Sequence, residues 1–313
     1  MNYGFAFFPG QGAQAPGMGK DLYENSQAAK LVFEEASEGA DLDVAKLCFE
    51  SDKATLSRTE NSQIAIFTHS MAAWAALKEA GVEFKAAAGF SLGEYTALAA
   101  AGVVSLADGV KIVSMRGKLM QQAADSIDGG MAAILGLEDS AIEEACAKVT
   151  SGVVRPVNYN CPGQLVVAGL KTTLPDFLSD VAANGGRAVP LNVSGGFHSP
   201  FMESASARLH DVLETMDVKE PTVPVYANYT AEPYTKEMAK ELLTQQVAHP
   251  VRWQQTVEKM IEAGVDTFVE VGAGKTLCGL IKKTSRAVKV YNVEDAETLS
   301  AAVQAIRAEG ENA

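Results

Sequence analysis

The sequence contains few cysteines and histidines, and neither type is arranged as a metal site or a disulfide framework. Its four cysteines, Cys48, Cys146, Cys161 and Cys278, are widely separated and form no Cys-x-x-Cys pair, and 313 residues include only four histidines. This spacing argues against a zinc site and against a scaffold held together by disulfides. We therefore expect a cytoplasmic chain, folded in a reducing compartment, that binds no metal.

Positive charge and long apolar runs are also scarce. The chain has 26 lysines and arginines against 39 aspartates and glutamates, which gives a formal net charge of −13. Such an excess of acid provides no overall attraction to nucleic acid or to an anionic membrane surface. No run of 18 apolar residues is present and the first ten residues do not resemble a signal peptide, so neither nucleic acid nor membrane is expected as a partner.

Apolar residues nevertheless make up 47% of the chain, and strand-like runs alternate with helical ones along most of it. This alternation predicts an α/β fold with a mostly parallel sheet that is covered on both faces. The strands expected in this sheet are 5–8, 86–89, 223–227, 267–271 and 288–293. The helices expected around it are 26–38, 61–80, 95–101, 105–124, 200–215, 235–247, 252–263, 276–284 and 295–308.

The middle of the chain has a different pattern. Strands are expected at 131–135, 153–159, 165–168 and 188–193, with helices at 138–149 and 173–184. This β-α-β-β-α-β order is typical of a ferredoxin-like unit. We therefore predict a ferredoxin-like subdomain at residues 125–193, inserted into a hydrolase-like catalytic core that consists of residues 1–124 and 194–313.

The strongest local motif is Gly89-Phe90-Ser91-Leu92-Gly93, which lies between a short apolar strand and a helix. In a nucleophile elbow, two glycines permit a sharp turn that exposes a serine hydroxyl at the N-terminus of a helix. Ser91 is therefore a candidate nucleophile. The alternative is a chance match in a chain that is rich in glycine and alanine.

A serine nucleophile needs a base, and the four histidines can be compared for this role. His69 and His210 lie within predicted helices, and His249 precedes a proline in a connection. His198 instead follows the glycine-rich stretch Ser194-Gly195-Gly196-Phe197, and such a loop at a sheet edge can face a cleft. We expect His198 to be the base, with a helix-capping role as the alternative.

Two glycine-rich loops resemble phosphate-binding motifs but depart from them. Gly10-Gln11-Gly12 continues through further glycines instead of opening a helix, and Gly274-Lys275-Thr276 lacks the first glycine of a P-loop because Val269 occupies that position. We expect no nucleotide cofactor at either loop.

Two cationic features remain. Arg116 lies in an otherwise apolar helix, where a guanidinium needs a partner, although an ordinary surface arginine is the alternative. Lys275, Lys282, Lys283, Arg286 and Lys289 place five basic residues and no acid between positions 275 and 289. This segment could be a solvated surface, or it could dock an acidic partner.

Taken together, these motifs resemble those of bacterial malonyl-CoA:acyl carrier protein transacylases, and the resemblance extends nearly from end to end. It rests on the segments 9–14, 89–94, 116–117, 158–164 and 197–199, on Gln246 with 250–253, and on 270–275. The resemblance implies an acyltransferase of fatty-acid biosynthesis that moves malonyl from malonyl-CoA to the phosphopantetheine thiol of acyl carrier protein, through a malonyl-serine. It also implies that no cofactor is needed, and we expect a monomer.

The resemblance further implies a role for each matching position. Ser91 would carry the acyl group, His198 would be its base, and the backbone carbonyl of Gln246 would orient that histidine. Gln11 and the amide of Leu92 would form the oxyanion hole, and Arg116 would bind the malonyl carboxylate. Apart from the resemblance, the local positive charge makes Lys282, Lys283, Arg286 and Lys289 the hypothesised docking site for the acidic carrier protein. The family usually has histidine where this chain has Phe90.

Two other functions share some of these features. A serine hydrolase shares the elbow, but it places an acid and then a late histidine after the serine, and no histidine follows His249 in this chain. A non-catalytic module that only binds a carrier protein would account for the basic segment. The joint presence of Ser91, His198 and Arg116 argues against that module.

Overall fold

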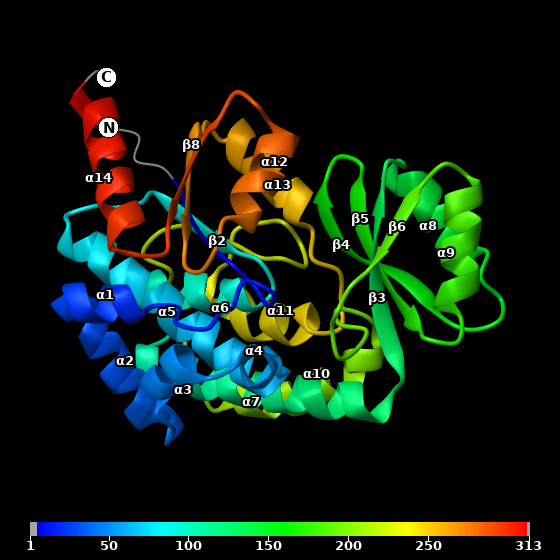
Figure 1. Cartoon of the computed structure of the whole chain (residues 1–313), viewed down its shortest axis with the longest axis horizontal. Helices are drawn as coiled ribbons and strands as arrows, with labels where there is room; N and C mark the ends of the chain where they lie inside the picture. Colours follow the sequence, from blue (N-terminus) through cyan, green and yellow to red (C-terminus); the bar gives the residue numbers. More distant parts are fainter. Residues whose placement is uncertain (1–4, 312–313) are drawn as a thin grey trace.

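Strand β1 (Phe5–Phe8) lies in the middle of a five-stranded sheet with the order β7-β2-β1-β8-β9, in which every neighbouring pair is parallel. The computed structural model describes residues 5–311, and Figure 1 shows this sheet inside the larger of two lobes. The other strands are β2 (Ala86–Gly89), β7 (Val225–Tyr226), β8 (Thr267–Val271) and β9 (Lys289–Val293).

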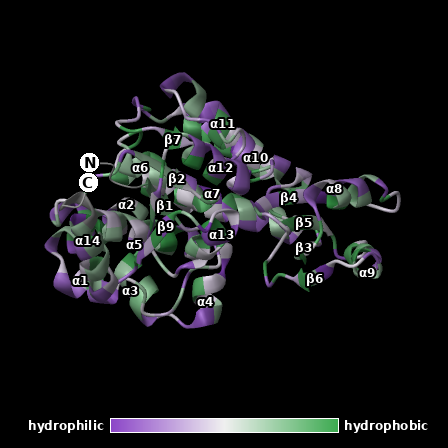
Figure 2. Cartoon of the chain, turned by 90° about the horizontal axis from the view of Figure 1, so that it is seen from above, coloured by the Kyte–Doolittle hydropathy of each residue, from purple (hydrophilic) through white to green (hydrophobic). Residues whose placement is uncertain are grey.

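The central strands are apolar on both faces because helices cover both sides of the sheet. Ala6 and Phe8 point into one core cluster, which contains helices α2 (Gln27–Ala40), α5 (Thr59–Glu79) and α7 (Leu106–Ser126). Phe5 and Phe7 point into a second cluster with α12 (Trp253–Glu262) and α13 (Thr276–Thr284). The alternation of side chains along a strand divides β1 between the two layers. In Figure 2 the hydrophilic colour is concentrated on outer helices such as α1 and α11.

The helices of the larger lobe run in sequence around this sheet. They are α1 (Lys20–Asn25), α2 (Gln27–Ala40), α3 (Val44–Glu50), α4 (Lys53–Ser57), α5 (Thr59–Glu79), α6 (Leu92–Ala100), α7 (Leu106–Ser126), η1 (Pro200–Met202), α10 (Glu203–Glu214), η2 (Lys236–Met238), α11 (Ala239–Gln246), α12 (Trp253–Glu262), α13 (Thr276–Thr284) and α14 (Ala296–Glu311). Ser105 caps α7 as its sequence indicates, since its side chain accepts a hydrogen bond from the amide of Asp108.

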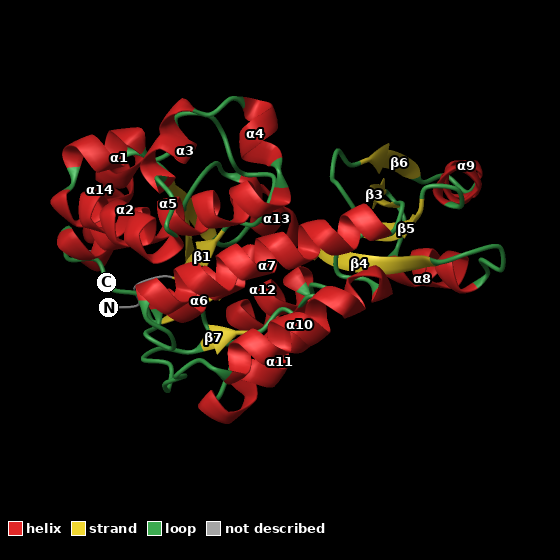
Figure 3. Cartoon of the chain, turned by 90° about the horizontal axis from the view of Figure 1, so that it is seen from below, coloured by secondary structure: helices red, strands yellow, loops and turns green. Residues whose placement is uncertain are grey.

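The smaller lobe is a four-stranded antiparallel sheet with two helices on one face (Figure 3). Its elements are β3 (Gly129–Leu135), α8 (Asp139–Ala147), β4 (Val154–Cys161), β5 (Gln164–Leu170), α9 (Leu174–Ala183) and β6 (Arg187–Pro190). The order β4-β5-β3-β6 is that of a ferredoxin-like unit. One face packs under α8 and α9, and residues such as Val166 and Ala168 on the other face join the main core.

The predicted fold class is confirmed: a parallel α/β core carries a small antiparallel subdomain. The division at residues 125 and 193 stays a prediction, although all four strands of the small sheet fall inside it. The short helices α1, α3 and α4 were not predicted, and β6 ends at Pro190 rather than at residue 193. Within residues 5–311, no helix combines the length and hydrophobicity that crossing a membrane requires.

Candidate active site

Ser91 occupies a strained turn between β2 and α6. Its backbone has φ 53° and ψ −105°, a conformation that non-glycine residues rarely adopt. A Cβ added to Gly89 would lie 1.9 Å from the carbonyl of Gly93, and one added to Gly93 would lie 2.0 Å from the oxygen of Phe8. Both glycines of the motif are therefore required by the close approach of the backbone, as in a nucleophile elbow.

Asn228 connects the two sides of this turn. Its Oδ1 accepts a hydrogen bond of 2.7 Å from the amide of Ser91, and its Nδ2 donates one of 2.6 Å to the carbonyl oxygen of Gly89. The side chain is fully buried. Since both of its bonds are to backbone atoms of the elbow, Asn228 stabilises the strained conformation of Ser91.

Ser91 and His198 form a dyad. The Oγ of Ser91 lies 2.7 Å from Nε2 of His198, and Nδ1 of His198 lies 2.9 Å from the carbonyl oxygen of Gln246. Because a carbonyl oxygen can only accept, Nδ1 carries the proton and Nε2 presents its lone pair to the hydroxyl. Burial, followed by the nearby charge of Arg116, lowers the pKa of His198 to about 4. The imidazole is therefore neutral at physiological pH and can accept a proton.

Arg116 is fully buried beside this dyad. Its Nη2 donates to Oγ of Ser91 at 3.2 Å and to Oε1 of Gln246 at 3.1 Å, and its Nη1 donates to Oε1 of Gln63 at 2.7 Å. The guanidinium also lies 5.0 Å from the ring centroid of Tyr95. All these partners are uncharged at neutral pH, and burial lowers the pKa of Arg116. A buried cation with neutral partners favours an anionic group next to Ser91.

Gln11 and Leu92 lie on two sides of the elbow. A Cβ on Gly10 would be 2.5 Å from the carbonyl oxygen of Phe90, so the loop that carries Gln11 passes directly against the elbow. The side chain of Gln11 donates to Oγ1 of Thr59 at 3.3 Å. Leu92 is the first residue of α6, where amide groups have no acceptor within the helix. Their part in an oxyanion hole stays a prediction.

Glu94 is the most prominent site residue that was not singled out from the sequence. It is fully buried on α6 and accepts hydrogen bonds from Nε2 of Gln246 at 2.8 Å, from the amide of Asn228 at 3.1 Å and from the hydroxyl of Tyr234. Burial raises its pKa to about 7. A lone acid in the alanine-rich helix Leu92–Ala100 was a detectable signal, as was Gln63 in an apolar helix.

The other three histidines lie outside this constellation. His69 is buried with Nε2 2.9 Å from the carbonyl oxygen of Glu294, and His249 has Nδ1 2.8 Å from the carbonyl oxygen of Gln245. His210 has only a long contact of 3.5 Å to Oγ1 of Thr244. In the part of the chain that the structure describes, no three His, Cys, Asp or Glu side chains are grouped to hold a metal ion.

Two aromatic side chains flank the dyad in sequence. Phe90 is half-buried, and its ring packs edge-on against Trp253 with centroids 5.7 Å apart. Phe197 is 6% exposed and belongs to the main core. Both rings therefore pack against apolar neighbours at positions directly adjacent in sequence to the dyad.

The basic residues around α13 form an exposed group at the seam between the lobes. Lys282, Lys283, Arg286 and Lys289 are all exposed, and α13 contacts β4 of the small subdomain (Figure 1). Lys283 donates to Oε1 of Gln164 at 3.2 Å, on the turn side of that subdomain. We call these four residues the α13 basic cluster.

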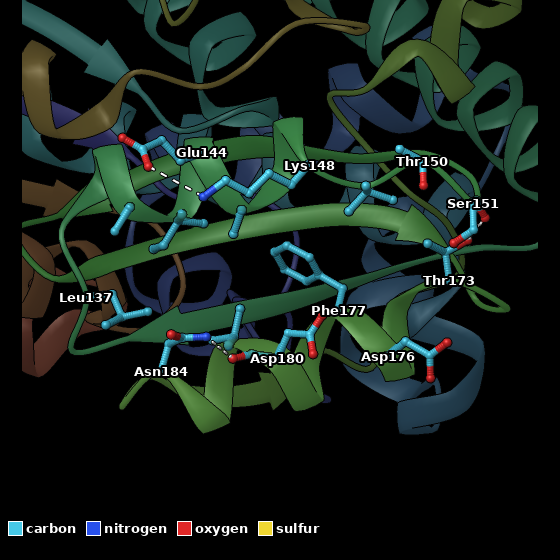
Figure 4. A pocket seen from close by; sticks show the side chains of 15 residues that line it. Leu137, Glu144, Lys148, Thr150, Ser151, Thr173, Asp176, Phe177, Asp180 and Asn184 are labelled. Carbon is cyan, nitrogen blue, oxygen red and sulfur yellow. Dashed lines mark hydrogen bonds and ion pairs between the residues drawn. The ribbon is translucent and has the colours of Figure 1, made fainter.

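A cavity of about 620 Å³ lies elsewhere, between α8 and α9 (Figure 4). Apolar residues such as Leu137 and Phe177 line it, and its charged residues are Glu144, Lys148, Asp176 and Asp180. Lys148 pairs with Glu144 at 3.7 Å. No residue of the Ser91 constellation lines this cavity, and its net negative charge disfavours anionic ligands.

Comparisons with known proteins agree over nearly the whole chain. The family model described as "Acyl transferase domain" matches residues 6–310. The malonyl CoA-acyl carrier protein transacylase of Bacillus subtilis is 43% identical over 311 residues, which covers 98% of each chain.

Solved structures are equally similar. The crystal structure of the same type of enzyme from Clostridium perfringens has a TM-score of 0.95 at 40% identity and covers 98% of both chains. A malonyl-transacylase in complex with a type II PKS acyl-carrier protein has a TM-score of 0.93 at 36% identity, covering 96% of this chain and 99% of that one.

Proposed function

The chain belongs to the family of malonyl CoA-acyl carrier protein transacylases, and we propose that Ser91, His198 and Arg116 carry out its reaction. The activity is the transfer of a malonyl group from malonyl-CoA to acyl carrier protein in fatty-acid synthesis. The observation that carries the assignment of residues is the contact of Ser91 with both His198 at 2.7 Å and Arg116 at 3.2 Å.

The first half-reaction acylates Ser91. His198 accepts the hydroxyl proton at Nε2 while Oγ attacks the thioester carbon, and the carbonyl oxygen of Gln246 stabilises the imidazolium that forms. We assign the oxyanion to the amide of Leu92 and to Gln11. Each such donor typically contributes about 10²–10³ in rate. Breakage of the C–S bond releases the CoA thiol, which takes the proton from His198.

Arg116 supplies selectivity for the free carboxylate of malonyl. A carboxylate on the acyl group would give the buried guanidinium a charged partner, in place of the neutral amides that it contacts in the structure. An acetyl group would offer no such partner and would leave the cation without one. Phe90 and Phe197 would limit the access of water to the acyl-serine.

The second half-reaction transfers the malonyl group to a thiol. The phosphopantetheine thiol of the carrier protein attacks the ester carbonyl, His198 takes the thiol proton, and it returns that proton to Oγ of Ser91. Because CoA leaves before the carrier binds, the kinetics are ping-pong.

The α13 basic cluster is proposed as the docking surface for the carrier. Acyl carrier proteins are acidic, and this chain is acidic as well, so an attractive surface has to be local. The cluster is exposed at the seam between the lobes, where α13 contacts β4. The structure of a related malonyl-transacylase in complex with a carrier protein supports a carrier as the partner. We further propose that the protein acts as a cytoplasmic monomer.

One assay separates this function from hydrolysis. Incubation with malonyl-CoA should release CoA continuously only when the carrier protein with its phosphopantetheine is present, and malonyl-carrier should accumulate. Release of free malonate at the same rate without the carrier would show a thioesterase. The absence of any acyl-protein would instead show a carrier-binding module.

A further inference from the structure

Gln246 connects the base to the arginine, and its side chain makes three further hydrogen bonds. Its Nε2 donates to the carbonyl oxygen of Ser91 at 2.7 Å and to Oε2 of Glu94 at 2.8 Å, while its Oε1 accepts from Nη2 of Arg116 at 3.1 Å. Gln246, Glu94 and Arg116 are all fully buried. No water competes for these partners, so the orientation of one amide decides which group Arg116 faces.

The partners determine that orientation. Nε2 faces two acceptors and Oε1 faces a donor; the reversed amide would place an N–H against the Arg116 guanidinium and its oxygen against the carbonyl of Ser91. Glu94 is the anionic partner in this arrangement. Its Oε1 already accepts two hydrogen bonds, from the amide of Asn228 and from the hydroxyl of Tyr234, so Oε2 is the oxygen that faces Gln246.

We propose that Glu94 is a positioning residue for acyl selectivity, which holds the Gln246 amide with its oxygen toward Arg116 and so directs the guanidinium at the acyl group on Ser91. This inference rests on the proposed function, because Arg116 is assigned there to the malonyl carboxylate. Glu94 does not act on His198 through this amide, since the histidine contacts the backbone carbonyl of Gln246. The contact that orients His198 therefore does not pass through the Glu94 carboxylate, and the larger effect should fall on the carboxylated substrate.

Replacement of Glu94 by glutamine isolates the effect. Two donors face the position of Oε1, so the carbonyl oxygen of the new amide takes that side and its NH₂ faces Gln246. Two NH₂ groups then oppose each other, so the Gln246 amide loses the anionic acceptor that holds its N–H away from Arg116. Glu94→Gln is expected to slow malonylation of Ser91 about 10- to 100-fold and to slow acetylation much less.

Protonation of Glu94 in the wild-type enzyme should act in the same way. Since Oε1 accepts two hydrogen bonds, the added proton is placed on Oε2, where it opposes Nε2 of Gln246. Burial raises the pKa of Glu94 to about 7, against the opposing effects of the Tyr234, Gln246 and Asn228 hydrogen bonds and of the Arg116 charge.

The other titratable groups around Glu94 change charge far from this pH. Burial raises the pKa of Tyr95 to about 12 and that of Tyr234 well above its ordinary value, and His198 has its pKa lowered to about 4. The kcat/KM for malonyl-CoA should therefore fall as pH falls through about 7. For acetyl-CoA it should fall only near 4, where His198 becomes protonated.

The experiment measures acylation of Ser91 by malonyl-CoA and by acetyl-CoA across this pH range, without carrier protein. Glu270→Gln is the matched control, because Glu270 is also buried with its pKa raised to about 7 but accepts from the amides of Leu277 and Cys278, away from Gln246. In Glu94→Gln, the fall in the malonylation rate as pH drops through about 7 should disappear. Glu270→Gln should keep both acylation rates and the pH dependence of malonylation.

A second variant keeps the test decisive if Glu94→Gln does not fold. Tyr234→Phe removes a hydrogen bond that lowers the pKa of Glu94. The pH at which the malonylation rate falls should therefore rise, while the pH dependence of acetylation should not change. The proposal would be overturned if the pH dependence of malonylation did not shift in Tyr234→Phe. It would also be overturned if Glu94→Gln slowed malonylation and acetylation equally, or slowed neither. A wild-type enzyme that fails to prefer malonyl would instead contradict the proposed role of Arg116.

Discussion

At the scale of single residues, the distinctive feature of this site is a buried cation that contacts Ser91, the proposed nucleophile. Arg116→Ala removes the proposed partner of the malonyl carboxylate. We expect it to lower kcat/KM for malonyl-CoA at least about 100-fold, because hydrogen bonds to charged groups contribute roughly 1.5–3 kcal/mol each, while acetyl-CoA is affected much less. Lys118→Ala, an exposed change two residues away on α7, is the control. Equal loss for both acyl donors would remove Arg116 from this role.

Residues differed in how far the sequence could assign them. Ser91 and His198 could be singled out as candidates because a motif and a short list of histidines pointed to them, and in the structure Oγ and Nε2 lie 2.7 Å apart. Glu94 could not be assigned, because its partners Tyr234 and Gln246 lie 140 and 152 positions away along the chain. No local spacing encodes such contacts; they exist only after the sheet has formed.

At the scale of elements, α13 is proposed to meet the carrier protein. Reversing the charge of Lys283 and Arg286 to glutamate should raise the KM for the carrier about tenfold and leave the KM for malonyl-CoA unchanged, since loss of complementary charge affects encounter with the protein partner. Lys148→Glu, an exposed charge reversal at the C-cap of α8, is the control for a change away from this cluster. If the carrier KM does not change, the α13 basic cluster is an ordinary solvated surface.

Helices and strands could be predicted from the sequence where the apolar pattern was long or where glycines marked its ends. Strand β8 and helix α13 have the predicted bounds, because apolar runs with glycine turns define both. Helices α1, α3 and α4 contain six, seven and five residues, too few for a helical period to be recognised. Packing against α2 and α5 stabilises these short helices, which would not be stable from their local sequence alone.

At the scale of the whole molecule, the net charge of −13 opposes an acidic carrier while the α13 basic cluster attracts it. Added salt should therefore raise the carrier KM of the wild-type enzyme, because it screens the local attraction over a Debye length of about 10 Å at 0.1 M. In the Lys283→Glu, Arg286→Glu variant, two glutamates offset the two remaining lysines of the cluster, so the overall repulsion dominates and salt should lower that KM. The same sign of salt dependence in both proteins would contradict a local docking surface.

The central claim is that the malonyl group is carried by Ser91, and mass spectrometry of the peptide that contains this residue tests it most directly. After mixing with malonyl-CoA, that peptide should carry a malonyl ester, and the ester should disappear when carrier protein with a free phosphopantetheine thiol is added. Ser91→Ala should show no adduct. A malonyl group on any other peptide, or an adduct on Ser91 that the carrier does not remove, would contradict the account.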